Sequence, residues 1–194
     1  MAFELFKRIG IEIKFSFVFI CALMLSFDKT SIGFFSLVCS VLHELGHVAY
    51  IAFSTSEKIH LILDYKGIAI KKKIFQKSKL NELFMLISGS LVNFVAAFIF
   101  YIIKKTTLTL INLFIGAFNL LPLSFLDGGR IVALIFSKKP LKFVDNLGQV
   151  LSYGCLISLV ALCIVLFIKR EINVSFAIII LYIGIYVTTR QGID

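Results

Sequence analysis

Six apolar segments, most of them close to the length that crosses a lipid bilayer, dominate this sequence of 194 residues. They cover residues 15–27, 31–53, 83–103, 108–126, 147–168 and 174–187, with Ile11 and Ile13 extending the first segment upstream. A spanning helix needs about 20 mostly apolar residues. The chain is 59% apolar and 16% charged, whereas soluble domains lie near about 45–50% and about 25%. We therefore expect an all-α membrane protein, a polytopic bundle of six transmembrane helices.

These six segments use most of the chain, and no stretch long enough for a separate soluble domain remains between them. The expectation is a single membrane-embedded domain over residues 1–194, with no appended soluble domain. The four cysteines lie inside apolar segments and form no C-x-x-C pair, so they predict packing residues rather than disulfides.

The basic residues are distributed unevenly between alternate loops. The segments on the side of the two termini hold fifteen of the twenty Lys and Arg residues, and the other side holds five. Because Lys and Arg favour cytoplasmic loops, we expect a multi-pass protein with both termini in the cytoplasm. The run at residues 71–73 is then a topology signal or a contact with anionic lipid headgroups. Nucleic acid is not expected as a partner, since no binding motif accompanies the charge.

The second apolar segment contains three ionisable residues within five positions, His43, Glu44 and His47. Ionisable groups inside a membrane span are energetically costly and by default indicate function. On a helix, residues four apart share one face, so both imidazoles can reach one metal ion, while Glu44 can approach a water at that metal. This H-E-x-x-H pattern is typical of zinc metalloproteases. The alternative is a polar helix face of a transporter.

Catalytic zinc sites usually have three protein ligands, and Asp127 is the candidate for the third. It follows Pro122, a helix breaker, in an otherwise apolar stretch; the alternative is an ordinary residue at a helix end. His60, in the lysine-rich loop, fits a solvated residue better than a ligand. Both segments 31–53 and 108–126 run toward the cytoplasm, which places the site in the cytoplasmic half of the bilayer. The expected site contains one zinc ion, its ligands His43, His47 and Asp127, and the catalytic base Glu44.

At these motifs the sequence resembles the site-2 protease family of intramembrane zinc metalloproteases. The family pairs H-E-x-x-H with N-x-x-P-x-x-x-x-D-G, which here runs from Asn119 to Gly128. A third family signature, G-P-x-x-N, is altered, because Ser90 stands in place of the proline between Gly89 and Asn93. The sequence looks most like the branch that processes an inactive sigma factor in bacterial sporulation, which implies a bacterial protein. The C-terminal nucleotide-binding module of that branch is not expected here.

The resemblance implies hydrolysis of a peptide bond in or near the transmembrane segment of a membrane-associated protein substrate, with a sigma factor or another transcription factor as the released product. It also implies regulatory membrane proteins as further partners beside the lipid bilayer. Asn119 and Asn93 are candidates for substrate binding through the peptide backbone, or alternatively for hydrogen bonds between helices. Other functions compatible with the residues are a catalytically silent membrane zinc-binding protein and a metal transporter with the same fold.

Residues 59–74 predict a short β-hairpin between the second and third helices. Two apolar runs rich in isoleucine flank Lys66 and Gly67, which form a turn signal. The hypothesis is that the edge of this hairpin pairs with an extended substrate strand, and the alternative is a simple amphipathic loop.

Overall fold

A computed structural model describes residues 9–26, 28, 31–54, 59–64, 67–70, 78–123 and 125–168. The chain divides into two compact units, Met1–Leu120 and Leu121–Asp194, and each is described by itself. The predicted sixth span, residues 174–187, lies outside the described residues.

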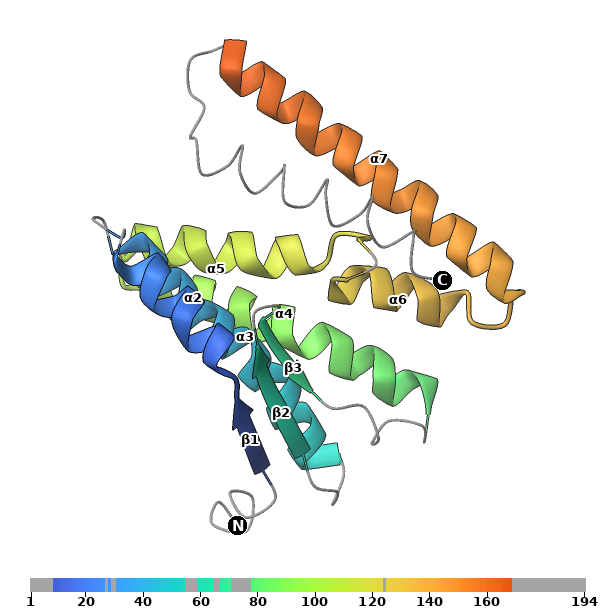
Figure 1. The fold of residues 1–194 in the computed structure, drawn as a ribbon, viewed down its shortest axis with the longest axis horizontal. Helices are drawn as coiled ribbons and strands as arrows, with labels where there is room; N and C mark the ends of the chain where they lie inside the picture. The colour runs from blue at the N-terminus through green and yellow to red at the C-terminus, as the bar shows by residue number, and fades with distance from the viewer. Residues whose placement is uncertain are drawn as a thin grey trace. The chain divides into compact units, whose positions relative to one another are not determined.

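The first unit contains a helical core and a small sheet (Figure 1). Its elements in chain order are β1 (Ile9–Ile13), α2 (Phe15–Ser26), α3 (Ile32–Ser54), β2 (Ile59–Asp64), β3 (Gly67–Ile70), α4 (Lys79–Ile102) and α5 (Thr106–Asn119). The three helices α3, α4 and α5 pack against one another in every pairing. Ile51 of α3 and Leu86 of α4 are almost completely buried. This three-helix core contains the histidines of the candidate site.

Local signals define the ends of α4. The Ser78 hydroxyl accepts a hydrogen bond from the Leu80 N–H at 3.2 Å, and Glu82 lies in the first turn; both features stabilise a helix N-terminus. The helix then runs without a break through Ser90, the position where the resembled family has proline. After α4 the backbone of Lys104 adopts φ 56°, and a short connection of this kind joins antiparallel neighbouring helices.

Glycines allow close contact between the helices of the core. A Cβ added at Gly46 of α3 would lie 2.7 Å from the carbonyl oxygen of Ser88 and 3.0 Å from the Cα of Gly89. A Cβ added at Gly116 of α5 would lie 2.8 Å from the ring of Phe94. Small residues of this kind let helix backbones approach closely in membrane proteins, and here they bring α4 directly against the face of α3 that carries the histidines.

The sheet has the strand order β1-β2-β3. β2 and β3 pair antiparallel, from Leu61 opposite Ile70 to Asp64 opposite Gly67, as predicted. The rest of the predicted second strand, residues 71–74, lies outside the described residues. The prediction that Ile11 and Ile13 extend the first helix is wrong, because both lie in β1, parallel to β2. β-Branched residues at alternate positions favour a strand, and the neighbouring strand β2 satisfies the backbone groups of β1.

The second unit has two helices among its described residues, α6 (Asp127–Ile135) and α7 (Leu141–Ile168). The predicted fourth span over residues 108–126 is therefore not one helix, since α5 ends at Asn119 and α6 starts at Asp127. Pro122 lacks an N–H and disfavours helical geometry at Leu121. Turn-like bonds from Leu123 N to Leu121 O, 2.8 Å, and from Leu126 N to Leu123 O, 2.9 Å, replace the helical pattern. The predicted fifth span, 147–168, lies within α7.

Three helices of the described part are long and apolar enough to cross a membrane, by length and composition: Ile32–Ser54, Lys79–Ile102 and Lys142–Ala161. The helices α2 and α5 have 12 and 14 residues. At about 1.5 Å per residue they are about 18 and 21 Å long, short of the hydrocarbon thickness of about 30 Å. The fold is mostly helical with three apolar candidate spans, and the count of six spans stays a prediction.

Candidate metal centre

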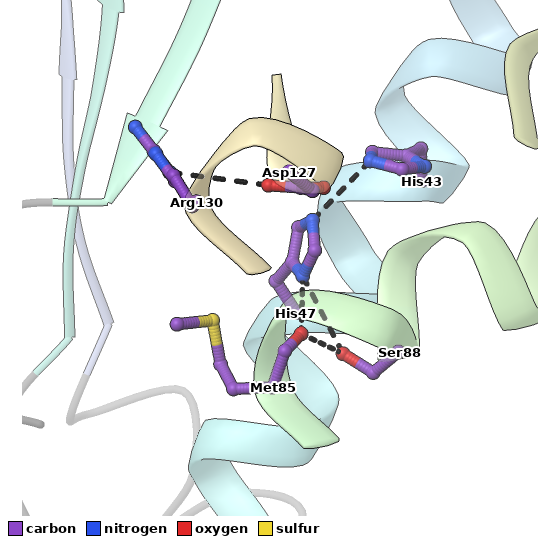
Figure 2. Close-up of polar contacts among 6 residues, drawn as sticks. All are labelled: His43, His47, Met85, Ser88, Asp127 and Arg130. Atoms are coloured by element: carbon purple, nitrogen blue, oxygen red, sulfur yellow. Dashed lines mark hydrogen bonds and ion pairs between the residues drawn. The ribbon is translucent and has the colours of Figure 1, made fainter. Parts of the chain in front are cut away.

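His43 and His47 form a buried imidazole pair on α3, one helical turn apart (Figure 2). His43 is 3% exposed and His47 is 4% exposed. The two rings meet edge to face, with centroids 4.9 Å apart, and the two Nε2 atoms are 3.2 Å apart. The spacing of four residues predicted this shared face, and the structure confirms it.

A backbone carbonyl fixes the orientation of His47. Its Nδ1 lies 2.7 Å from the carbonyl oxygen of Met85 on α4, and the hydroxyl of Ser88 donates to the same oxygen at 2.7 Å (Figure 2). A carbonyl oxygen only accepts hydrogen bonds. Nδ1 of His47 is therefore the protonated nitrogen, and Nε2 carries the lone pair.

A side-chain amide fixes the orientation of His43 in the same sense. Its Nδ1 lies 2.8 Å from Oδ1 of Asn93. The amide nitrogen of Asn93 donates to the carbonyl oxygen of Cys39 at 3.1 Å and to Oδ1 of Asn112 at 2.9 Å. Because Nδ2 points at two acceptors, Oδ1 is the acceptor for His43. Nδ1 of His43 is therefore also protonated, and in the neutral rings both Nε2 atoms of the pair carry lone pairs.

This arrangement fits a zinc ion. Zinc-binding histidines almost always donate their second ring nitrogen to a carbonyl, carboxylate or water, as both histidines do here. Two nitrogen ligands of a tetrahedral zinc ion, each at about 2.0–2.1 Å, lie about 3.3–3.4 Å apart, close to the observed 3.2 Å. A Cβ added at Gly89 would lie 2.5 Å from Nε2 of His47 and 2.8 Å from Cε1 of His43. The glycine thus keeps space open beside the two ligand nitrogens.

The two predicted acidic residues lie in different units. Glu44 directly follows His43 on α3 and is half-buried. Asp127 is the first residue of α6, is 8% exposed, and has Oδ1 3.9 Å from Nη1 of Arg130 in the next turn. The N-terminus of a helix favours a negative charge, and Asp127 lies in the first turn of α6.

The two asparagines predicted to bind substrate, Asn93 and Asn119, have different surroundings in the structure. Asn93 is fully buried, and its amide bonds to His43, Cys39 and Asn112, which agrees with the alternative of hydrogen bonds between helices. Asn119 is half-buried and donates to the carbonyl of Ile115 in its own helix at 3.0 Å. Asn112 of this network was not among the predicted residues, although a polar amide inside an apolar segment, seven residues before Asn119, is a signal of the same kind.

Three comparisons relate this chain to known proteins. A family model described as peptidase family M50 matches residues 105–162, a segment that includes Asp127. The chain is 34% identical over 208 residues to a zinc metalloprotease of Methanocaldococcus jannaschii, a match that covers 93% of this chain and 58% of that protein. It is also similar to the solved site-2 protease from Methanocaldococcus jannaschii, with a TM-score of 0.65 and 25% identity over 94% of this chain and 90% of that chain.

The chain thus spans 58% of the length of the curated relative that it matches. Within that limit, the family model, the curated relative and the solved structure are all described as proteases. Together they support the site-2 protease, or M50, family for this chain.

Proposed function

We propose, from the support for the site-2 protease family, that this chain is an intramembrane zinc endopeptidase that hydrolyses a peptide bond in or near the transmembrane segment of a membrane-associated protein. The observation that carries the proposal is the imidazole pair of His43 and His47. Both rings donate through Nδ1 to carbonyl oxygens, and their Nε2 atoms lie 3.2 Å apart in an apolar helix core. Two neutral imidazoles arranged in this way direct both Nε2 lone pairs at one point, as a shared metal ion requires.

The zinc ligands in this proposal are His43, His47 and Asp127, each of which offers one ligand atom. Imidazole nitrogen and carboxylate oxygen are ligands that zinc takes in catalytic sites, where three protein ligands leave a fourth position open. When bound, zinc would supply Lewis-acid chemistry that polarises the scissile carbonyl and acidifies a water. Asp127 lies within residues 105–162, the segment that the M50 family model matches.

Glu44 acts as the general base in this proposal. A carboxylate oxygen of Glu44 accepts the proton of the attacking water and then delivers it to the nitrogen of the leaving amine, so that the proton balance closes within one turnover. Glu44 is half-buried on the same helix as the two histidines, and a partly dehydrated setting strengthens its electrostatic interaction with the reacting groups.

The sheet provides the proposed means of holding an unwound substrate. β2 is the central strand and pairs with β1 on one side and with β3 on the other. Within the hairpin, the edge that can accept a further strand is therefore the outer edge of β3. An extended peptide that adds to such an edge gains main-chain hydrogen bonds. Asn119 is the proposed side-chain contact to the substrate backbone.

The finer parts of the proposal rest on the sequence. The distribution of Lys and Arg supports cytoplasmic termini and a site in the cytoplasmic half of the bilayer. The motifs shared with the sporulation branch support a membrane-bound sigma or other transcription factor as substrate, and regulatory membrane proteins as partners.

The test compares wild-type protein with Glu44→Gln, using Glu82→Gln in the first turn of α4 as a matched control. Each variant is coexpressed with candidate membrane-associated proteins from the same genome, cleavage is followed by immunoblot and terminal sequencing, and zinc content is measured on the purified proteins. We expect Glu44→Gln to retain zinc and to lose cleavage by about 10²- to 10⁴-fold, while Glu82→Gln behaves as wild type. Undiminished cleavage by Glu44→Gln would contradict the base role. Zinc transport into proteoliposomes without cleavage would favour the transporter alternative.

A further inference from the structure

The two histidines differ in the kind of group that orients them. The acceptor for His47 is the main-chain carbonyl of Met85, which no substitution of a side chain removes. The acceptor for His43 is the side-chain oxygen of Asn93. An amide side chain can rotate by 180° and exchange its oxygen for its nitrogen. His43 therefore depends on whatever holds the Asn93 amide in one orientation.

A rotated Asn93 amide would change the chemistry of His43. Nδ2 would then face Nδ1 of His43, which would have to accept, and the ring proton would move to Nε2. Nε2 would lose the lone pair that a metal requires. The orientation of one buried amide thus decides whether His43 presents a ligand nitrogen.

Two acceptors hold the Asn93 amide in the observed orientation. One is the carbonyl oxygen of Cys39, 3.1 Å from Nδ2, and the other is Oδ1 of Asn112, 2.9 Å from Nδ2. Cys39 is on α3, Asn93 on α4 and Asn112 on α5, so the contacts join all three helices of the core. Asn112 supplies one of the two bonds that oppose rotation.

The amide of Asn112 is itself fixed. Its Nδ2 donates to the carbonyl oxygen of Leu108 at 2.9 Å and lies 3.1 Å from the sulfur of Cys39. Rotation of this amide would place Oδ1 against the Leu108 carbonyl, where two acceptors would meet. Asn112 is completely buried, and a buried polar group without a partner costs about 1–3 kcal/mol. Oδ1 of Asn112 is thereby directed at Asn93.

We infer that Asn112 and Asn93 act in series as positioning residues for His43, with Asn112 orienting the Asn93 amide and Asn93 keeping the proton of His43 on Nδ1 so that Nε2 binds the metal. This inference rests on the proposed zinc site. Asn112 thus has a role in metal binding although none of its described hydrogen bonds is to either histidine.

The experiment measures the zinc dissociation constant of purified full-length protein in lipid nanodiscs by competition with a chelating dye. Losing a group that orients a metal ligand typically weakens metal affinity by about 10- to 100-fold. We expect Asn93→Leu to weaken zinc binding within that range, and Asn112→Leu by about tenfold. Because Asn112 acts through Asn93, the double variant should bind zinc as Asn93→Leu does, without a further loss.

Thr109→Val is the matched control. Thr109 is one turn before Asn112 on α5, is buried, and donates only within its own helix, to the carbonyl of Lys105 at 3.1 Å. We expect its zinc dissociation constant to stay within twofold of wild type. The melting temperature of each metal-free variant reports folding separately, and Asn112→Ala replaces Asn112→Leu if the leucine variant does not fold.

The outcomes separate this inference from the proposed function. If His43→Ala leaves zinc affinity unchanged, the proposed zinc site itself is wrong. If His43→Ala abolishes zinc binding but Asn112→Leu stays within twofold of wild type, the site stands and the inference on Asn112 is overturned. Additive losses in the double variant, or an equal loss in Thr109→Val, would show general loosening of the core and would also overturn it.

Discussion

Gly89→Ala adds one methyl group at the point where α4 meets the imidazole pair, and it tests whether that space is needed for zinc. The added Cβ would lie 2.5 Å from Nε2 and 2.7 Å from Cε1 of His47, and 2.8 Å from Cε1 of His43. The first of these atoms is the proposed ligand nitrogen. The substitution keeps an ordinary helical backbone, so its effect should come from the methyl group alone.

The size of the effect follows from the required displacement. Contacts under 3.0 Å are essentially not observed for a Cβ atom, and ordinary contact begins at 3.4 Å, so Nε2 of His47 must retreat by about 0.5–0.9 Å. Metal–ligand distances vary by only about 0.2 Å. A misplacement of about 1 Å in a catalytic arrangement costs about 100-fold in rate, or about 2.7 kcal/mol in the activation barrier. We therefore expect zinc affinity to fall by about 10- to 100-fold and cleavage by about 100-fold.

The assay combines zinc dissociation constants with cleavage rates at saturating zinc, and two other glycines serve as controls. A Cβ at Gly148 of α7 has no heavy atom within 4 Å, so Gly148→Ala should leave both quantities unchanged. A Cβ at Gly116 of α5 would meet the ring of Phe94 at 2.8 Å, so Gly116→Ala should lower the melting temperature without the specific loss of zinc.

Two results would refute this reasoning. A zinc dissociation constant of Gly89→Ala within twofold of wild type would show that His47 does not bind metal through Nε2 beside Gly89. An equal loss of zinc in Gly116→Ala would show that the effect comes from helix packing in general.

Three further changes test other parts of the site. Asp127→Ala should weaken zinc affinity and cleavage together, measured by dye competition and substrate cleavage, because it removes one of three proposed ligands; unchanged zinc affinity would mean that another residue is the third ligand. Gly46→Ala should lower the melting temperature, since its Cβ would lie 2.7 Å from the carbonyl oxygen of Ser88 and force α3 away from α4; an unchanged melting temperature would contradict close packing there. Proline at the β3 positions whose N–H groups point away from β2 should slow cleavage at constant zinc content, because it removes donors for an added strand; unchanged cleavage would exclude strand addition at this edge.

The parts of the site that the sequence predicted are those that helix geometry alone determines. Residues four apart on a helix share a face, so the pairing of His43 with His47 needed no knowledge of the fold. The antiparallel hairpin followed from a turn signal between two apolar runs. These features depend only on the local sequence, and the structure confirms the shared histidine face and the antiparallel pairing of β2 with β3.

The remaining features depend on contacts distant in the sequence. The acceptor for His47 is a main-chain carbonyl, and every residue type has one, so no letter in the sequence indicates Met85. The isoleucines of β1 continue the apolar pattern of the neighbouring segment and so predict an extension of its helix, whereas the pairing with β2 makes these residues a strand. Pro122 indicates a helix break, but the apolar length of residues 108–126 favours a single span and outweighs this local signal in a prediction from sequence.

The polar residues of the three-helix core show how one buried network can serve both packing and chemistry. In an apolar helix core, hydrogen bonds between helices stabilise association by about 0.6–2 kcal/mol each, which is sufficient reason for Asn93 and Asn112 to be there. That reason alone does not specify which way each amide points. The orientation acquires a consequence at His43, where it decides which ring nitrogen carries the proton. His47 depends mainly on a backbone carbonyl, which cannot rotate independently of its helix, although the Ser88 hydroxyl also lies 3.4 Å from its Nδ1. Substitutions of Asn93 on α4 and Asn112 on α5 should therefore tune metal binding through His43 while the acceptor of His47 stays in place.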